Sequence, residues 1–321
     1  MATAANKTKT STARRASNVS RHNPDWKIRR VDNLRILQSP GLSQLQWLVH
    51  GFSTRLGGIS EFGAPGTHEK NEPVLNLGFA DWHSRQYVTE NRRRFAEAIG
   101  ARKMRMVTLR QIHSDIVHLI TRNQEGHSNP LQGDALLTRE PGLLLTVQTA
   151  DCIPILLADN RTRAVAAIHA GWRGTLKRIS QKALGRMRME FGTRPEDVLV
   201  ALGPGIGGCC YEVGHEVARE FAAQFPEARD WFAGRFEAVA GGDNDPSWLP
   251  WLTMMPPGHA PEPPRVHLDL VAANRAILCA AGVPPRNIAA SGFCTACRTD
   301  LFFSYRKEHN TGRLMAAIGI L

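Results

Sequence analysis

The sequence predicts an α+β fold with mixed sheets, and two observations lead to this prediction. Residues 143–147, 153–158 and 164–168 are near-continuous apolar runs of strand length, which is typical of buried strands. Strand-like segments also outnumber helical ones, and the helices do not alternate with the strands as a doubly wound parallel sheet requires. We therefore expect a single α+β domain over residues 31–321.

The first half of this domain is expected to hold short strands and one helix. Residues 47–54 have the pattern of a strand, with a turn at 55–58, and a polar segment with glycine and proline at 61–73 predicts a loop. Residues 87–99 have helical spacing and end at Gly100, a plausible C-cap. Further short strands are predicted at 106–109, 116–120 and 134–138.

The second half is expected to be richer in regular structure. A turn at 159–162 joins two of the apolar runs as a hairpin. The stretch 240–264 holds seven of the 19 prolines, together with Trp248 and Trp251, and predicts a surface insertion. Helices are predicted at 175–191, 215–225 and 268–281, and strands at 198–202, 288–291 and 315–321.

The basic charge of the chain is concentrated at its beginning. The net charge is +11, and residues 1–30 hold eight Lys or Arg against one acid, Asp25, so they carry +7 of it. This segment has almost no large apolar residue and is expected to be a solvated, disordered tail, with a transit peptide or a nucleic-acid arm as alternatives. The remainder is close to neutral, so nucleic acid is not the expected partner.

Composition points to a soluble protein of a reducing compartment. The chain is 42% hydrophobic and 21% charged, and no apolar run reaches the ~18 residues of a membrane helix. No secretory signal is visible, and six cysteines in 321 residues are too sparse for a disulfide framework. We expect a cytoplasmic protein, without a membrane partner, that is a monomer or a homodimer.

Three residues in separate apolar contexts form a candidate metal site: His113, Cys152 and His169. Two imidazoles and one thiolate suit a zinc ion whose fourth position is open to substrate. Their separations of 39 and 17 residues are not those of a zinc finger, so spacing alone gives little support. Asp151, an acid within an apolar segment, is expected to orient a ligand or to carry protons.

Two further motifs have simpler interpretations. Residues 294–297 form a lone CxxC, and a structural zinc would need a second pair, for which adjacent Cys209 and Cys210 are poorly spaced. A structural zinc site and a redox motif are both less favoured interpretations of these cysteines than ordinary free thiols. The glycine-rich segment 203–208 has the wrong spacing for a dinucleotide site but can approach a ligand closely. Arg173, just after two glycines, is a candidate anion ligand.

A series of motifs in order along the chain carries a family resemblance. They are Phe52-Ser53-Thr54-Arg55, Asn76-Leu77-Gly78, Arg110-Gln111-Ile112-His113, Thr149-Ala150-Asp151-Cys152, His169-Ala170-Gly171-Trp172-Arg173-Gly174, Cys210-Tyr211-Glu212-Val213 and Phe302-Phe303-Ser304-Tyr305-Arg306. Together they closely resemble the YfiH-like laccase-domain, or multicopper polyphenol oxidase, family of purine nucleoside phosphorylases. The resemblance runs from about residue 48 to residue 321 and excludes the tail and the 240–264 insertion.

The resemblance implies a fold, a metal and an activity. It implies four α/β/β/α layers with mixed sheets, similar to the catalytic domain of cytotoxic necrotizing factor, and a Zn²⁺ site at His113, Cys152 and His169. It implies phosphorolysis of adenosine, inosine and S-methyl-5'-thioadenosine, with adenosine deamination as a second activity. Purine nucleosides and phosphate would then be the binding partners.

The residues around this site suggest roles and leave alternatives open. Arg55 and Arg173 are candidates for phosphate, with a strand-end salt bridge as the other interpretation of Arg55. Asn76 and Gln111 are candidates for sugar or base, and Asp151 for proton transfer. A Cu²⁺-dependent polyphenol oxidase would need more histidines and a Cys-His-Met set. A Cys-His hydrolase, for example one acting on peptidoglycan precursors, would use Cys152 as nucleophile and His169 as base.

Overall fold

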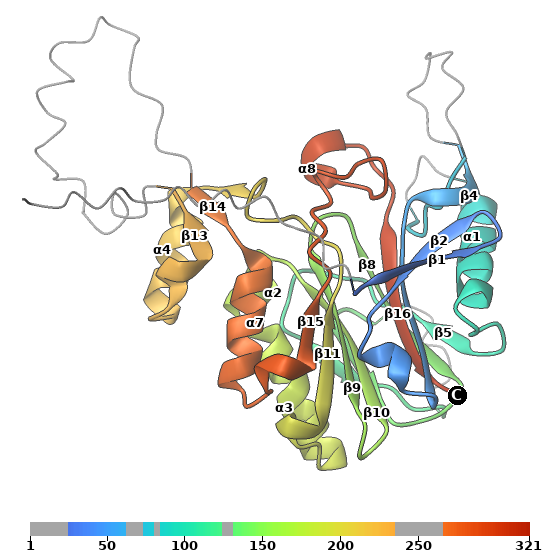
Figure 1. Cartoon of the computed structure of the whole chain (residues 1–321), viewed down its shortest axis with the longest axis horizontal. Helices are drawn as coiled ribbons and strands as arrows, with labels where there is room; N and C mark the ends of the chain where they lie inside the picture. Colours follow the sequence, from blue (N-terminus) through green and yellow to red (C-terminus); the bar gives the residue numbers. More distant parts are fainter. Residues whose placement is uncertain (1–24, 62–72, 80–83, 124–130, 235–265) are drawn as a thin grey trace, which may run out of the picture.

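Two six-stranded sheets face each other, and helices cover their outer sides (Figure 1). The computed structural model describes residues 25–61, 73–79, 84–123, 131–234 and 266–321. Helix α1 lies outside one sheet, and α3 and α7 lie outside the other (Figure 1). The fold is therefore α+β with four α/β/β/α layers, as predicted.

The first sheet contains the two ends of the described chain. Its strand order is β1-β2-β3-β16-β8-β5, and the central strand β16 is antiparallel to both β3 and β8. The strands are β1 (Lys27–Val31), β2 (Leu34–Gln38), β3 (Leu48–Ser53), β5 (Arg105–Val107), β8 (Leu143–Thr149) and β16 (Leu314–Ile320), with β4 (Leu56–Ser60) beside them.

The second sheet carries the candidate site. Its order is β15-β11-β9-β10-β7-β6, antiparallel except for the two outer pairs. The strands are β6 (Val117–Leu119), β7 (Ala135–Thr138), β9 (Ile153–Asp159), β10 (Ala164–Ala170), β11 (Val198–Leu202) and β15 (Ile288–Ala290). A small third sheet joins β12 (Glu212–Val213), β14 (Val266–Leu268) and β13 (Phe232–Ala233).

Helices of very different lengths complete the layers. Within the described residues, the α-helices are α1 (Arg85–Ala98), α2 (Trp172–Leu176), α3 (Ile179–Phe191), α4 (His215–Gln224), α7 (Leu270–Ala280) and α8 (Tyr305–Glu308). Short 3₁₀ turns occur at Leu42–Gln44, Pro195–Asp197, Ala228–Trp231 and Pro285–Asn287. Helix α7 begins after Asp269, whose carboxylate accepts a hydrogen bond from the N–H of Ala272 as an N-cap.

Alternation of side chains along the central strands explains why these apolar runs have no polar face. In β10, Val165 and Ala167 point into the core between the sheets, whereas Ala166 and Ile168 point to the core under α3 and α7. Both faces of the strand are thus buried in apolar surroundings, and burial of this kind is the main stabilising term of the fold.

Most predicted elements are present, but three predictions were wrong. Leu56–Ser60, which includes most of the turn expected at 55–58, forms strand β4. The single helix expected at 175–191 is two helices, because Arg178 adopts a left-handed conformation (φ 59°) that interrupts the α-helical hydrogen bonds. Residues 27–30 belong to β1, so the folded part begins before the predicted end of the tail at residue 30.

Other predictions concern residues that the structure does not describe, and several strands were not predicted. Residues 1–24, most of the loop at 61–73 and the insertion at 240–264 lie outside the described residues. The strands β1, β2, β12, β13 and β14 were not anticipated by the sequence patterns. None of the helices in the described ranges is both long and apolar enough to cross a membrane.

Candidate metal centre

The hairpin of β9 and β10 brings Cys152 and His169 together. The strands are antiparallel with His169 opposite Pro154 and Ala170 opposite Ile153, so the residue before β9 lies beside the end of β10. His113 reaches the same place from the loop between β5 and β6. The ligand atoms of His113, Cys152 and His169 all lie within 4.8 Å of one another, so the predicted convergence of these three residues is present in the structure.

Asp134 organises the two histidines. Its side chain is completely buried at the start of β7, and its Oδ1 lies 2.8 Å from Nδ1 of His169. The same carboxylate accepts hydrogen bonds from the backbone N–H groups of Ile112, His113 and Ser114. Since Nδ1 of His169 is engaged by Asp134, Nε2 is the atom left to bind a ligand.

Hydrogen bonds keep the buried Asp134 carboxylate ionised. Burial by itself would raise its pKa, but hydrogen bonds from His169 and Ser114 outweigh burial and lower the pKa to about 2. A charged carboxylate in this position fixes the His169 ring and holds the backbone of the His113 loop.

The backbone around the site has one residue in an uncommon conformation and one glycine that a side chain could not replace without a clash. His113 has a left-handed conformation (φ 56°), and its Nε2 lies 3.9 Å from Sγ of Cys152. A Cβ atom at Gly171 would lie 2.9 Å from Sγ of Cys152 and 3.0 Å from Cδ2 of His113. Only glycine at position 171 leaves the ligand atoms where they are. Non-glycine residues with positive φ are often held at functional sites.

Without a bound cation, Cys152 and His169 form a charged pair. Burial raises the pKa of the Cys152 thiol, but the charge of His169 and hydrogen bonds from His113 and His169 outweigh it and lower the pKa to about 6. Burial lowers the pKa of His169, whereas the Cys152 thiolate and Asp134 raise it to about 9. A thiolate is also the form in which cysteine binds a metal.

The donor set fits a catalytic metal ion. It offers one thiolate and two imidazole nitrogens, with His113 exposed and His169 buried. Three protein ligands with one accessible side are typical of catalytic zinc rather than structural zinc. The arrangement can therefore hold a divalent ion and present it to a substrate.

Asp151 connects the site to two distant loops. It precedes Cys152 and has a positive φ of 103°. Its Oδ1 accepts a hydrogen bond from Thr295 Oγ1 at 2.7 Å, and its Oδ2 accepts one from the backbone N–H of Arg306 at 2.7 Å. Both carboxylate oxygens thus have donors, which fixes the conformation of the segment that presents Cys152.

Arg173 is the most available cation next to the site. It lies two residues beyond Gly171, is exposed, and its guanidinium stacks on the Trp172 ring at 4.5 Å. Across the described ranges, no hydrogen bond or ion pair to a protein group occupies this guanidinium. The free guanidinium has the geometry to bind an oxyanion with two parallel hydrogen bonds.

Arg55 makes the strand-end salt bridge that was the alternative to phosphate binding. Its Nη1 lies 2.7 Å from Oε1 of Glu308 and donates to the carbonyl of Thr299, and the guanidinium covers the Phe303 ring. Both ionic partners are largely buried, so this pair holds the segment around α8 against the β3–β4 connection.

The two predicted amides, Asn76 and Gln111, are also engaged within the protein. Buried Asn76 accepts hydrogen bonds through Oδ1 from the N–H groups of Gly78 and Arg313. Gln111 donates to the carbonyl of Gln148 and accepts from its N–H, both at 2.7 Å. These amides shape the backbone near the site.

Sequence reasoning missed Asp134 and Thr295. Asp134 follows Gly133 and precedes the apolar segment 135–137, which is the same signal, an acid beside an apolar run, that singled out Asp151. Thr295 gives no such signal, because its contact with Asp151 spans 144 residues of sequence.

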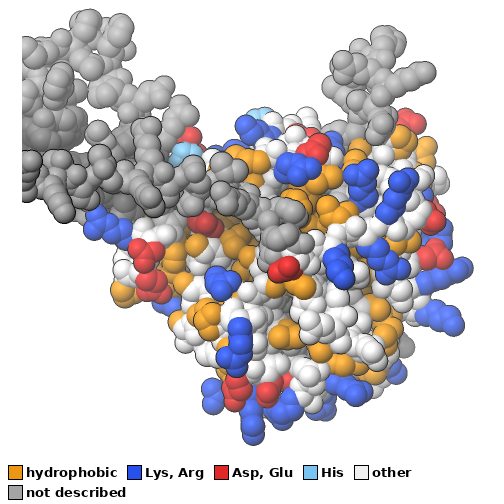
Figure 2. Space-filling view, viewed as in Figure 1, with side chains coloured by type: hydrophobic (Ala, Val, Ile, Leu, Met, Phe, Trp, Pro, Cys, Tyr) orange, Lys and Arg blue, Asp and Glu red, His pale blue; other side chains and the backbone are white. Residues whose placement is uncertain are grey.

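The surface does not gather its basic residues into one patch on the face in view. Figure 2 shows Lys and Arg side chains spread over the described part of this face among apolar and acidic ones. On α3, Lys182 pairs with Asp115, and Arg186 pairs with Glu190 at 2.6 Å. Two basic residues of this helix are thus neutralised by acidic neighbours.

The fold and the donor set define an α/β/β/α protein with a three-ligand His-Cys-His centre. Comparison with known proteins is consistent with this description, because the model of the family described as "multi-copper polyphenol oxidoreductase laccase" matches residues 49–321. The chain belongs to this family.

Similar proteins cover most of the chain. A protein named purine nucleoside phosphorylase from Deinococcus radiodurans is 37% identical over 288 residues, which are 89% of this chain and 93% of that protein. Adenosine deaminase RL5, from an unknown prokaryotic organism, is 34% identical over 72% of this chain and 81% of its own length. The crystal structure of the Bacillus licheniformis protein YfiH has a TM-score of 0.73 at 27% identity and covers 93% of this chain and 100% of that one.

Proposed function

We propose that this chain is a zinc-dependent purine nucleoside phosphorylase. It cleaves adenosine, inosine and S-methyl-5'-thioadenosine with phosphate, and it also deaminates adenosine. The observation that carries the proposal is the convergence of His113, Cys152 and His169 within 4.8 Å, in a chain 37% identical to a protein named purine nucleoside phosphorylase. The deaminase activity draws on the similarity to adenosine deaminase RL5.

The donor set favours zinc over copper. Two imidazoles and one thiolate match three-ligand catalytic zinc sites, whereas a copper oxidase would be expected to use more histidines. Bound zinc would supply Lewis acidity and lower the pKa of a bound water. The Asp134–His169 hydrogen bond supports such a site, since histidine ligands usually donate their second N–H to a carboxylate or carbonyl.

In phosphorolysis, a phosphate oxygen forms a bond to the anomeric carbon while the bond from that carbon to the purine nitrogen breaks. The purine leaves with the bonding electron pair and takes up a proton. Arg173 is our candidate for holding the phosphate, because it lies four residues after His169 and its exposed guanidinium contacts only the Trp172 ring among the described residues. The guanidinium of Arg55 is already paired with the carboxylate of Glu308, so we assign Arg55 a structural role.

Asp151, Asn76 and Gln111 act as positioning residues in this proposal. Each already has protein partners for the atoms that would otherwise contact substrate. Their hydrogen bonds hold the Cys152 segment and its neighbouring loops, and placement of this kind is worth a large part of a catalytic rate.

Phosphate dependence of base release tests the proposal. Purified chain incubated with adenosine should form adenine only when phosphate is added, with an equal amount of ribose 1-phosphate. The Cys152→Ala variant should lose both the zinc of this site and the activity. Adenine release without phosphate would overturn the phosphorylase assignment, and a fully active Cys152→Ala variant would overturn the role of Cys152.

A Cys-His hydrolase is the second candidate, and one observation favours it. Cys152, His169 and Asp134 are in the order nucleophile, base and orienting acid, and the Cys152 pKa is lowered to about 6. Metal removal separates the two candidates. Chelation should inactivate the phosphorylase reversibly, with recovery on added zinc, whereas a thiol hydrolase would stay active without metal.

A further inference from the structure

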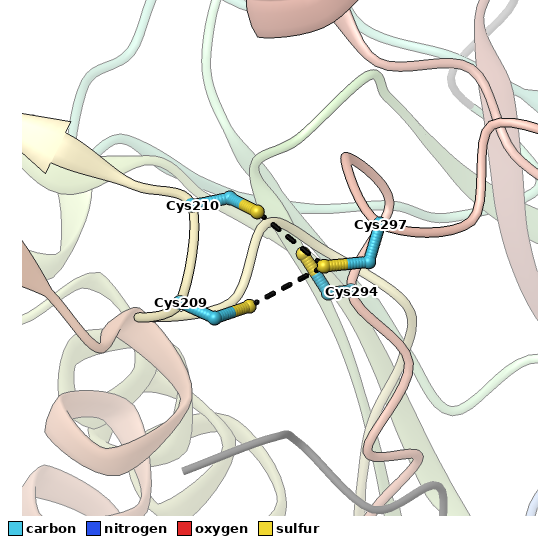
Figure 3. Close-up of side chains that lie close together, drawn as sticks. All are labelled: Cys209, Cys210, Cys294 and Cys297. Carbon is cyan, nitrogen blue, oxygen red and sulfur yellow. Dashed lines mark hydrogen bonds between the residues drawn. The ribbon is translucent and has the colours of Figure 1, made fainter. Parts of the chain in front are cut away.

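A second group of metal-binding side chains lies outside the His-Cys-His centre. The Sγ atoms of Cys209, Cys210, Cys294 and Cys297 all lie within 4.8 Å of one another, and all four are free thiols (Figure 3). We propose that these four cysteines bind a structural zinc ion. The sequence favoured ordinary thiols for these residues, and the structure instead brings together two pairs that are separated by more than 80 residues.

The sulfur positions match a tetrahedral thiolate site. Sγ of Cys297 lies 3.4 Å from that of Cys210 and 3.6 Å from that of Cys209. Zinc–sulfur bonds of ~2.3 Å in a tetrahedron place the sulfurs roughly 3.8 Å apart, whereas a disulfide requires ~2.05 Å. Figure 3 shows the four side chains directed toward a common point from two loops. Four thiolate donors without an open position are typical of structural zinc.

Backbone geometry around the cluster supports a ligand role for Cys294. The N–H of Gly207 donates a hydrogen bond to Sγ of Cys294 at 3.2 Å. Hydrogen bonds of this kind orient metal-bound groups and offset the charge of thiolates. A Cβ atom at Gly207 would lie 3.2 Å from Sγ of Cys209 and 3.3 Å from Cβ of Cys294, so this glycine gives the two loops room to approach.

The solvent exposure of these cysteines also argues that they are not four free thiols without a bound metal. Cys209 and Cys297 are exposed, Cys210 is partly exposed, and Cys294 is buried. Exposed cysteines that approach each other closely are prone to oxidation, and a bound zinc ion protects them by engaging each thiolate. Burial of apolar area does not explain why the two exposed thiols lie together.

The cluster joins two loops that both contact Asp151, the residue before Cys152. The loops follow the parallel neighbours β11 and β15, and the N–H of Thr295 donates to the carbonyl of Gly205. From one loop, Ile206 N–H donates to the carbonyl of Asp151, and from the other, Thr295 Oγ1 donates to its carboxylate. A zinc ion holding the loops together would therefore fix Asp151, which precedes Cys152.

Zinc content of the full chain and matched variants tests the proposal. Protein expressed in zinc-supplemented medium and then purified should contain two zinc ions per chain, as measured by inductively coupled plasma mass spectrometry. Cys297→Ser and Cys152→Ala should each contain one, and the control Cys279→Ser should contain two, because Cys279 lies on α7 outside both clusters. The double variant of Cys297 and Cys152 should contain none.

Cobalt exchange gives a measurement that does not depend on how Cys297→Ser folds. In the Cys152→Ala background, which is expected to lose the other site, added Co²⁺ should give the intense sulfur-to-metal absorption of a tetrahedral tetrathiolate. An equal zinc content in wild type and Cys297→Ser would overturn the proposal, as would iron in place of zinc or a disulfide in anaerobically purified protein. These counts involve no activity, so they are independent of whether the phosphorylase assignment holds.

Discussion

The His-Cys-His centre and the four-cysteine cluster differ in what holds their side chains. His169 stands at the end of a central strand and Cys152 just before its neighbour, and a buried carboxylate, Asp134, fixes the His169 ring. The four cysteines come from loops, where a backbone N–H of Gly207 is the hydrogen-bond donor to one sulfur. Protein contacts hold the ligands of the first site, whereas in the second site the proposed zinc ion would supply part of the order.

Their donor sets differ in the same direction. Three donors with an exposed His113 leave a side for substrate, and four sulfurs do not. The ends of central strands can place side chains precisely for chemistry, while an ion between neighbouring loops would add stability there. Asp151 links the two regions because it contacts Thr295 within the CxxC segment and precedes Cys152.

The largest expected effect separates the two regions by activity. His169→Ala should lower kcat/KM for adenosine phosphorolysis about a thousandfold, roughly 4 kcal/mol of transition-state stabilisation. Cys297→Ser should lower it less than about tenfold per folded molecule, because it acts only through the loops. Steady-state kinetics on protein matched by circular dichroism would check this. An equal loss in both variants would contradict the distinction between the two sites.

Folding stability at low pH can be compared between the two regions only after the effect of His50, which lies away from both, has been subtracted. His50 is buried on β3, and its Nε2 accepts a hydrogen bond from the N–H of Ser39. Burial lowers its pKa from 6.5 to about 4. The unfolded chain therefore takes up a proton below pH 6.5 before the folded chain does, and stability falls as the pH drops from 6.5 to 4.

The expected size of this contribution is about 3 kcal/mol over that range. Urea unfolding of wild type and His50→Gln at pH 7 and pH 4 measures it as the difference in their pH dependence. A difference below about 1 kcal/mol would show that His50 is not the source.

The sequence predicted the framework of the fold because that framework is made of long apolar runs. In β9 and β10 both faces are buried, and a continuous apolar pattern is what such a strand requires. The β12–β14–β13 sheet was missed because its strands have two or three residues and no usable period. The break between α2 and α3 was missed because no proline or glycine marks Arg178.

The candidate sites show the same division. His113, Cys152 and His169 were found through ordered motifs, since their separations in sequence carried no metal signal. The four-cysteine cluster was not predicted, because adjacent cysteines do not match the usual ligand spacing and the convergence of two loops is a property of the sheet order. Arg55 shows the reverse case, where a plausible ligand is engaged by Glu308.

A change at Asp134 tests whether protein contacts hold the ligands of the first site. Asp134→Asn keeps the shape of the side chain but removes the charge that holds His169 and the N–H groups of His113 and Ser114. Zinc affinity at the His-Cys-His centre should fall about 10–100-fold, which is typical when a carboxylate that orients a metal-binding histidine is lost. Competition with a chromophoric chelator in the Cys297→Ser background measures this site alone. An unchanged affinity would mean that Asp134 does not orient the ligand.

The smallest expected effect concerns Arg173, at the border of the first region. Arg173→Met should raise the KM for phosphate about tenfold, because a charge-assisted hydrogen bond is worth roughly 1.5–3 kcal/mol. The KM for adenosine should change little, and both zinc ions should remain. Arg173→Lys keeps the charge but loses the paired donors, so it should recover part of the phosphate affinity. If Arg173→Met instead raised the KM for adenosine alone, Arg173 would belong to the nucleoside side of the site, and the phosphate would have to be bound by another group.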